Sequence, residues 1–186
     1  MPSGHASHQV GLDADIWLRP MPERKMTVAE LEKVKPVIVV KNRKSIDPAV
    51  WTQAHAKLIR RAASYPEVAR IFVHPPIKAE LCKWATGDRS WLAKVRPYYG
   101  HNYHFHIRMR CPAGDTACKN QPDPHPADGT GCGEELAYWL GNAPWKRIEQ
   151  PPPAQKPVKP VKPAKPAAPL TLASLPAECR AVVTAE

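Results

Sequence analysis

The chain has 186 residues, of which 43% are hydrophobic and 24% are charged, and its net charge is +10. This composition is that of a globular domain with a hydrophobic core, and no apolar run approaches the ~18 residues that span a bilayer. The positive charge suits a polyanionic partner, such as nucleic acid, anionic lipid or an acidic cell-wall polymer. Because no helix-turn-helix, zinc-finger or basic-aromatic RNA motif is present, we do not expect nucleic acid to be that partner.

Two short strands are predicted near the start of the chain. Residues 12–17, Leu-Asp-Ala-Asp-Ile-Trp, follow a turn and alternate with the period of a strand, which places Asp13 and Asp15 on one face. Residues 36–42 form an apolar run typical of a buried strand.

A long helix is predicted over residues 47–66. Asp47 is its expected N-cap, a proline follows at the first helical position, and Pro66 ends the helix. Its apolar stripe is expected to consist of Trp51, Ala54, Leu58 and Ala62, which leaves His55 on the solvent-exposed surface.

Strands and helices alternate over the rest of the body. We expect strands at 68–73 and 102–110, and helices at 76–85, 88–95 and 133–141. His74 and His125 each precede a proline and are expected in loops. The pattern predicts an α+β fold in which helices flank an antiparallel sheet.

The composition changes at Gln150, where Lys-Pro pairs repeat at intervals of three residues. Proline donates no backbone hydrogen bond, so this segment is expected to be an extended, polyproline-II-like linker. The predicted organisation is a body of residues 1–149, a linker of residues 150–169 and a C-terminal segment of residues 170–186.

The five cysteines form no CxxC pair, which argues against a structural zinc site or a redox dithiol. They lie in sequences typical of loops and suit disulfides, which persist in oxidising compartments. We therefore expect an exported protein, although no signal peptide is visible in the chain.

Two histidine-containing segments have the residue types of a zinc hydrolase site. His8 and Asp15 are separated by a predicted turn, and His104 and His106 lie two residues apart on a predicted strand, so both point to one face. A hydrolytic zinc site needs three His, Asp or Glu ligands and one open position for water. Strand spacing alone does not choose between Asp13 and Asp15 as the carboxylate ligand.

Three segments, GHASHQVGLDADIW, DRSWLAKVRPYYGHNYHFHIRMRCPAG and DGTGCGEELAYW, together resemble the penicillin-insensitive murein endopeptidases. That family belongs to the zinc peptidases that share a fold with lysostaphin, D-alanyl-D-alanine carboxypeptidases and the hedgehog signalling domain. The resemblance covers residues 3–140 and implies that residues 1–149 are a zinc peptidase domain.

The resemblance also implies roles for individual residues. The expected Zn²⁺ ligands are His8, Asp15 and His106, and Asp15 is thereby preferred to Asp13. His104 matches the catalytic base or the residue that stabilises the oxyanion, and His101 matches a further active-site histidine that handles the proton. His5 matches another active-site histidine.

The resemblance also implies how the cysteines pair in disulfides. The resemblance implies a Cys111–Cys118 bridge and a Cys82–Cys132 bridge, and Cys179 is then expected to pair with a cysteine near a mature N-terminus that this chain does not contain. Family members also carry a segment before the first ligand. We therefore expect that the chain has lost its N-terminal part, signal peptide included.

The expected function is a periplasmic, β-lactam-insensitive zinc endopeptidase whose partner is peptidoglycan and which cleaves D-alanyl–meso-diaminopimelyl cross-links. Two alternatives stay open from the sequence. One is a D-alanyl carboxypeptidase or dipeptidase of the same fold, and the other is a non-catalytic peptidoglycan-binding remnant.

Overall fold

The computed structural model describes residues 8, 11–149 and 171–174. The chain divides into a unit of residues 1–149 and a unit of residues 150–186. In the second unit the structure describes the short helix η3 (Leu172–Ser174). The expected linker and C-terminal segment lie almost entirely outside the described residues, so their boundaries stay predictions.

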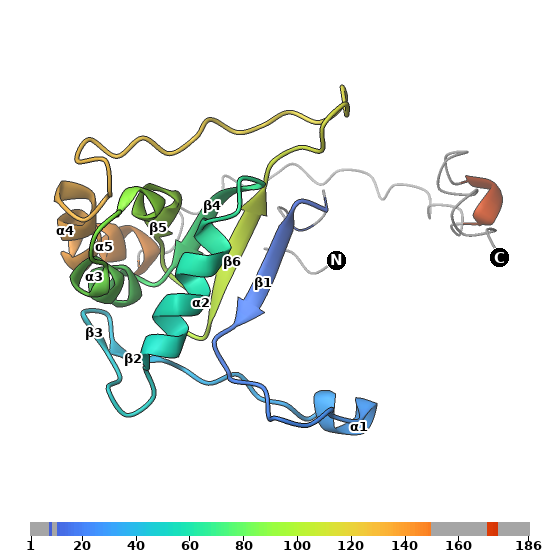
Figure 1. Cartoon of the computed structure of the whole chain (residues 1–186), viewed down its shortest axis with the longest axis horizontal. Coiled ribbons are helices and arrows are strands. Elements are labelled where there is room, and N and C mark those ends of the chain that lie inside the picture. Colours follow the sequence, from blue (N-terminus) through green and yellow to red (C-terminus); the bar gives the residue numbers. More distant parts are fainter. Residues whose placement is uncertain (1–7, 9–10, 150–170, 175–186) are drawn as a thin grey trace, which may run out of the picture. The chain divides into compact units, whose positions relative to one another are not determined.

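A four-stranded sheet forms the centre of the first unit, with the strand order β1-β6-β4-β5 (Figure 1). Its strands are β1 (Asp13–Trp17), β4 (Val68–Val73), β5 (Val95–Pro97) and β6 (His104–Met109). The β1–β6 and β4–β6 pairs are antiparallel, whereas β4 and β5 are parallel. The α+β class is confirmed, with one parallel pair added to the expected antiparallel sheet.

The two faces of the sheet differ in chemistry because side chains alternate along each strand. On β6, Phe105 is buried in the hydrophobic core and Ile107 packs against that core. Helix α2 (Gln53–Ala63) lies across the sheet, and its Ile59 joins the same core as Ile71 of β4 (Figure 1). The other face of β6 carries His104 and His106, so the helix-covered side is apolar and the opposite side holds the histidines.

Helix α2 begins later than the sequence predicts. Its N-cap is Thr52, and the Nδ1 atom of His55 accepts a hydrogen bond from the Thr52 backbone N–H at 2.9 Å. Asp47 instead begins a separate turn, in which its carboxylate accepts a hydrogen bond from the backbone N–H of Ala49 at 3.0 Å. The predicted N-cap at Asp47 is wrong because the Asp47–Pro48 pair starts a turn that ends before the helix begins.

The buried face of α2 is also rotated relative to the predicted stripe. Leu58 is 43% exposed, whereas His55 is only 5% exposed. The ring Nε2 of His55 donates to the carbonyl of Leu18 at 2.8 Å, which satisfies the buried polar group. The expectation of a surface His55 is therefore wrong. The helix residues that are buried are His55, Ala56, Ile59 and Ala63.

The remaining elements are short helices and a separate two-stranded sheet. The apolar run at 36–42 is a strand only over Val40–Asn42, which is half-buried to exposed, so the expectation of a buried strand is wrong. Val39 is buried, whereas Ile38 is 54% exposed. His74 and His125 both lie outside helices and strands, as expected, but His74 is buried as the N-cap of α3 (Pro75–Trp84), whereas His125 is exposed. These elements are α1 (Val28–Leu31), β2 (Val40–Asn42), β3 (Ser45–Ile46), α3 (Pro75–Trp84), η2 (Ser90–Lys94), α4 (Glu134–Leu140) and α5 (Ala143–Glu149).

Two disulfides close loops of very different length. Cys82–Cys132 joins residues 50 positions apart, and Cys111–Cys118 joins residues 7 positions apart. Both expected bridges are confirmed, and Cys179 lies outside the described residues. Within the described part of the chain, none of the helices has both the length and the apolar character to cross a membrane.

Candidate metal centre

The candidate site is built on the open face of β1 and β6. The antiparallel register places Asp13 opposite Arg108, Asp15 opposite His106 and Trp17 opposite His104. Side chains of directly opposed residues on one face lie about 5 Å apart at Cβ. The pairing of these two strands therefore brings Asp15 against His106, although 90 residues separate them in the chain.

Three side chains converge into a group able to hold a metal ion. The Nε2 atom of His8 lies 3.5 Å from Oδ2 of Asp15, and Nδ1 of His106 lies 3.2 Å from Oδ1 of Asp15. One ligand atom from each residue lies within 4.8 Å of the others. The rings of His8 and His106 meet edge to face, with centroids 4.8 Å apart.

His104 borders this group from the same face of β6. Its Nε2 atom lies 3.6 Å from Oδ1 of Asp15, and its side chain is 10% exposed. Side chains two residues apart on a strand point to the same face, which explains why His104 and His106 both face Asp15.

His101 lies in the loop between β5 and β6, beside His104. Its ring centroid is 5.0 Å from that of His104. Because a carbonyl can only accept, the 2.7 Å contact between His101 Nδ1 and the Tyr99 carbonyl makes Nδ1 the protonated nitrogen. Burial, reinforced by the neighbouring histidines and opposed by this hydrogen bond and by Asp15, lowers the pKa of His101 to about 4. The ring is therefore neutral near pH 7, with the lone pair on Nε2.

These groups line a cleft of about 590 Å³. One wall is aromatic: Tyr98 and Tyr99 stack with their centroids 4.5 Å apart, and Phe72 contacts both Tyr98 and His101. Arg70, from β4, contributes positive charge to the cleft. The arrangement places the candidate metal ligands in a recess that combines polar and charged side chains with an aromatic wall.

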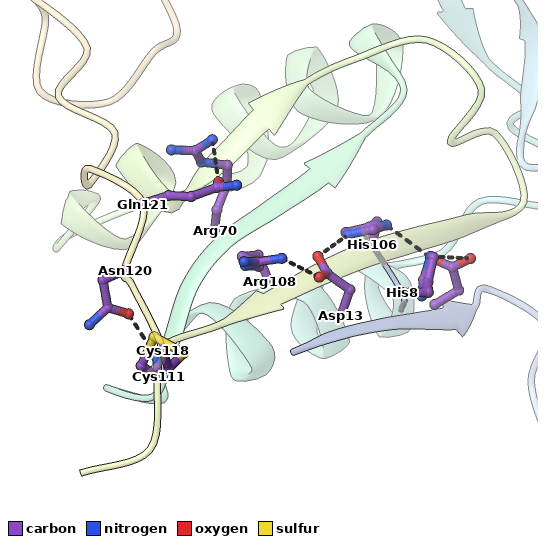
Figure 2. Close-up of polar contacts among 10 residues, drawn as sticks. His8, Asp13, Arg70, His106, Arg108, Cys111, Cys118, Asn120 and Gln121 are labelled. Carbon is purple, nitrogen blue, oxygen red and sulfur yellow. Dashed lines mark hydrogen bonds and ion pairs between the residues drawn. A yellow bond between two sulfur atoms is a disulfide. The ribbon is translucent and has the colours of Figure 1, made fainter. Parts of the chain in front are cut away.

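The structure thus brings together five of the six site residues expected from the sequence, namely His8, Asp15, His101, His104 and His106. His5 lies outside the described residues. Sequence reasoning did not assign a function to Asp13, whose carboxylate contacts both His106 and Arg108 (Figure 2). The alternation of β1 placed Asp13 on the site face, but only the pairing with β6 shows what it contacts.

The donor set fits a catalytic zinc ion. Two imidazoles and one carboxylate are a ligand combination that catalytic Zn²⁺ sites use, with the fourth position left for water or substrate. The Nε2 atom of His106 is held by Asp13 at 2.7 Å, so Nδ1 is the nitrogen that is available to a metal.

Comparison with known proteins finds a matching family and several similar sequences. A family model described as penicillin-insensitive murein endopeptidase matches residues 1–184. The chain is similar to proteins of that name from Haemophilus influenzae, with 52% identity over 74% of this chain and 48% of the relative, and from Yersinia enterocolitica, with 48% identity over 74% of this chain and 50% of the relative. A protein of the same name from Klebsiella pneumoniae is 44% identical over 83% of this chain and 55% of the relative. The chain spans about half the length of these relatives.

Proposed function

Because the chain belongs to the penicillin-insensitive murein endopeptidase family, we propose that it is a zinc-dependent metallopeptidase that hydrolyses D-alanyl–meso-diaminopimelyl cross-links in peptidoglycan. The observation that carries the proposal is the convergence of His8, Asp15 and His106 within 4.8 Å of one another. Two further histidines line the same cleft. Hydrolysis of this kind requires no acylated serine, so β-lactams have no nucleophile to trap.

The three ligands would be Nε2 of His8, a carboxylate oxygen of Asp15 and Nδ1 of His106. A Zn²⁺ ion held by them supplies a Lewis acid that polarises an amide carbonyl and lowers the pKa of a water molecule.

His101 and His104 are the proposed proton-handling residues. His101 is neutral because burial lowers its pKa to about 4, and its Nδ1–H is committed to the Tyr99 carbonyl. Its Nε2 atom is therefore the ring nitrogen that offers a lone pair to a proton. His104, within 3.6 Å of Asp15, lies where it can stabilise negative charge that develops on a carbonyl oxygen or share in the proton transfer.

The cleft and the charge of the protein suit a peptide substrate within an anionic polymer. The stacked Tyr98 and Tyr99, each 39% exposed, offer an apolar wall to a peptide stem, and Arg70 lies beside it. A net charge of +10 favours approach to the wall polymer. Two disulfides are consistent with an oxidising compartment, and we propose the periplasm.

The decisive experiment measures zinc content and the products formed from purified cross-linked muropeptide dimers. We expect one Zn²⁺ per chain and conversion of dimers to monomers, both lost on treatment with EDTA or in His106→Ala. His125→Ala is the matched control, because His125 is an exposed loop histidine outside the cleft. Release of free D-alanine without conversion of dimers would indicate a carboxypeptidase, and wall binding without cleavage would indicate a non-catalytic module.

A further inference from the structure

The side chain of Asp13 is buried at the base of the candidate metal centre. It is 2% exposed, whereas the side chain of Asp15, two residues along the same strand, is 30% exposed. Both carboxylate oxygens of Asp13 are engaged: Oδ1 lies 2.7 Å from Nε2 of His106, and Oδ2 is contacted by the Arg108 guanidinium (Figure 2). Asp13 is therefore a bridge between an arginine and a candidate metal ligand.

The contact with Asp13 determines which nitrogen of His106 carries the hydrogen. An ionised carboxylate only accepts hydrogen bonds, so Nε2 of His106 must be the donor. The other ring nitrogen, Nδ1, lies 3.2 Å from Oδ1 of Asp15 and is therefore the nitrogen directed at the metal site. Hydrogen bonds of this kind from a carboxylate to a metal-binding histidine fix the orientation and tautomer of the ring.

Arg108 in turn holds Asp13. The two residues are directly opposed in the β1–β6 register, and the Arg108 side chain is only 13% exposed. A buried carboxylate without a cationic partner is strongly destabilising. The guanidinium neutralises that charge and leaves Oδ1 directed at His106.

We propose that Asp13 is a positioning residue that holds His106 in its Nε2-protonated form, with Nδ1 directed at the metal site, and that Arg108 holds Asp13 in place. This inference rests on the proposed function in taking Zn²⁺ as the ion bound. Asp13 acts through His106 and touches neither metal nor substrate. It explains why β1 carries two aspartates on one face: Asp15 serves the metal directly and Asp13 serves it through His106.

Two measurements test the proposal on the whole chain. The first is the tautomer of the His106 ring in the metal-free protein, recorded by long-range ¹H–¹⁵N NMR in a pH series that is carried upward until the ring is neutral. The second is the affinity for Zn²⁺, measured by competition with a chromophoric chelator. The His106 signals are assigned by their loss in His106→Gln.

We expect the wild-type ring to be Nε2-protonated. In Asp13→Ala it interconverts between tautomers, and Zn²⁺ binds about 10–100-fold more weakly. In Asp13→Asn the amide oxygen accepts from the Arg108 guanidinium and the amide NH₂ faces Nε2, so we expect the Nε2-protonated form and the Zn²⁺ affinity to be lost as in Asp13→Ala. Asp123→Asn is the matched control, because it removes another Asp–Arg pair, that of Asp123 with Arg110, without contacting His106.

Three results would overturn the proposal. The first is a neutral wild-type His106 ring that is protonated on Nδ1. This result needs no variant, so it overturns the proposal even where Asp13→Ala fails to fold. An unchanged Nε2 tautomer and affinity in a folded Asp13→Ala would also overturn it. So would a loss of Zn²⁺ binding in Asp13→Ala as complete as in Asp15→Ala, because Asp13 would then be a ligand itself. If the wild-type chain binds no Zn²⁺, the proposed function fails, and the tautomer comparison still decides the role of Asp13.

Discussion

Replacement of His55 by alanine tests how the strand that carries Asp13 and Asp15 is anchored. His55 is 5% exposed, and its Nε2–H donates to the carbonyl of Leu18, the residue that follows β1. In the sheet that the structure describes, β1 is an edge strand that pairs with β6 alone. The His55 contact therefore ties the end of β1 to helix α2 on the other side of the core.

The expected loss follows from the contacts removed. A buried carbonyl left without a partner at Leu18, which is 1% exposed, costs about 1–3 kcal/mol. Loss of the contact between the His55 ring and the Thr52 N–H removes a helix cap worth about 1 kcal/mol. The stacking of His55 on Trp51, with centroids 5.2 Å apart, adds a smaller amount. We expect His55→Ala to lower the free energy of unfolding by about 3 kcal/mol.

Urea denaturation followed by tryptophan fluorescence measures this loss. His55→Gln should recover about 1 kcal/mol, because a carboxamide can donate to the Leu18 carbonyl. Lys57→Ala, an exposed change on the same helix, should stay within about 0.5 kcal/mol of wild type. The reasoning is refuted if His55→Ala costs less than about 1 kcal/mol or if the glutamine and alanine variants are equally unstable.

Two further predictions concern the stability of the scaffold. Loop-closure entropy predicts that Cys82→Ala/Cys132→Ala, which opens a 50-residue separation, costs about 4 kcal/mol, whereas Cys111→Ala/Cys118→Ala, with a separation of 7, costs about 2.4 kcal/mol; equal losses in urea denaturation would contradict this order. Burial lowers the pKa of His74 from 6.5 to about 4, so between these values the unfolded chain binds a proton that the folded chain does not. The neutral His74 ring therefore contributes fully to the free energy of unfolding above pH 6.5. This contribution falls by about 3 kcal/mol as the pH is lowered from 6.5 toward 4. His74→Phe, which retains a ring against Trp145, should remove this part of the pH dependence, and an unchanged slope in unfolding experiments between pH 4 and 7 would refute it.

The sequence is sufficient to predict the features that depend only on residues close to one another in the chain. The strand at 68–73 and the helix at 133–141 are predicted within one residue at each end, because the strand is a short run rich in apolar residues and the helix lies between two glycines. The HxH spacing correctly placed His104 and His106 on one face of a strand, and the resemblance correctly paired the cysteines of both bridges.

The rotation of helix α2 was beyond local reasoning. Trp51, Ala54, Leu58 and Ala62 form a plausible apolar stripe, yet the face that contacts the sheet is one position further along. His55 is polar and was assigned to the surface. Its burial depends on the Leu18 carbonyl, 37 residues away, which supplies the hydrogen bond that makes burial favourable.

The sequence by itself determined the residue types of the site: the histidines, the two aspartates and the period of two that gives each strand its faces. The tertiary structure decided which aspartate has which neighbour, because the register of β1 on β6 sets Asp15 against His106 and Asp13 against Arg108. A one-residue shift of that register would turn both aspartates to the other face. Strand pairing is a long-range interaction, and periodicity within one segment carries no information about its partner.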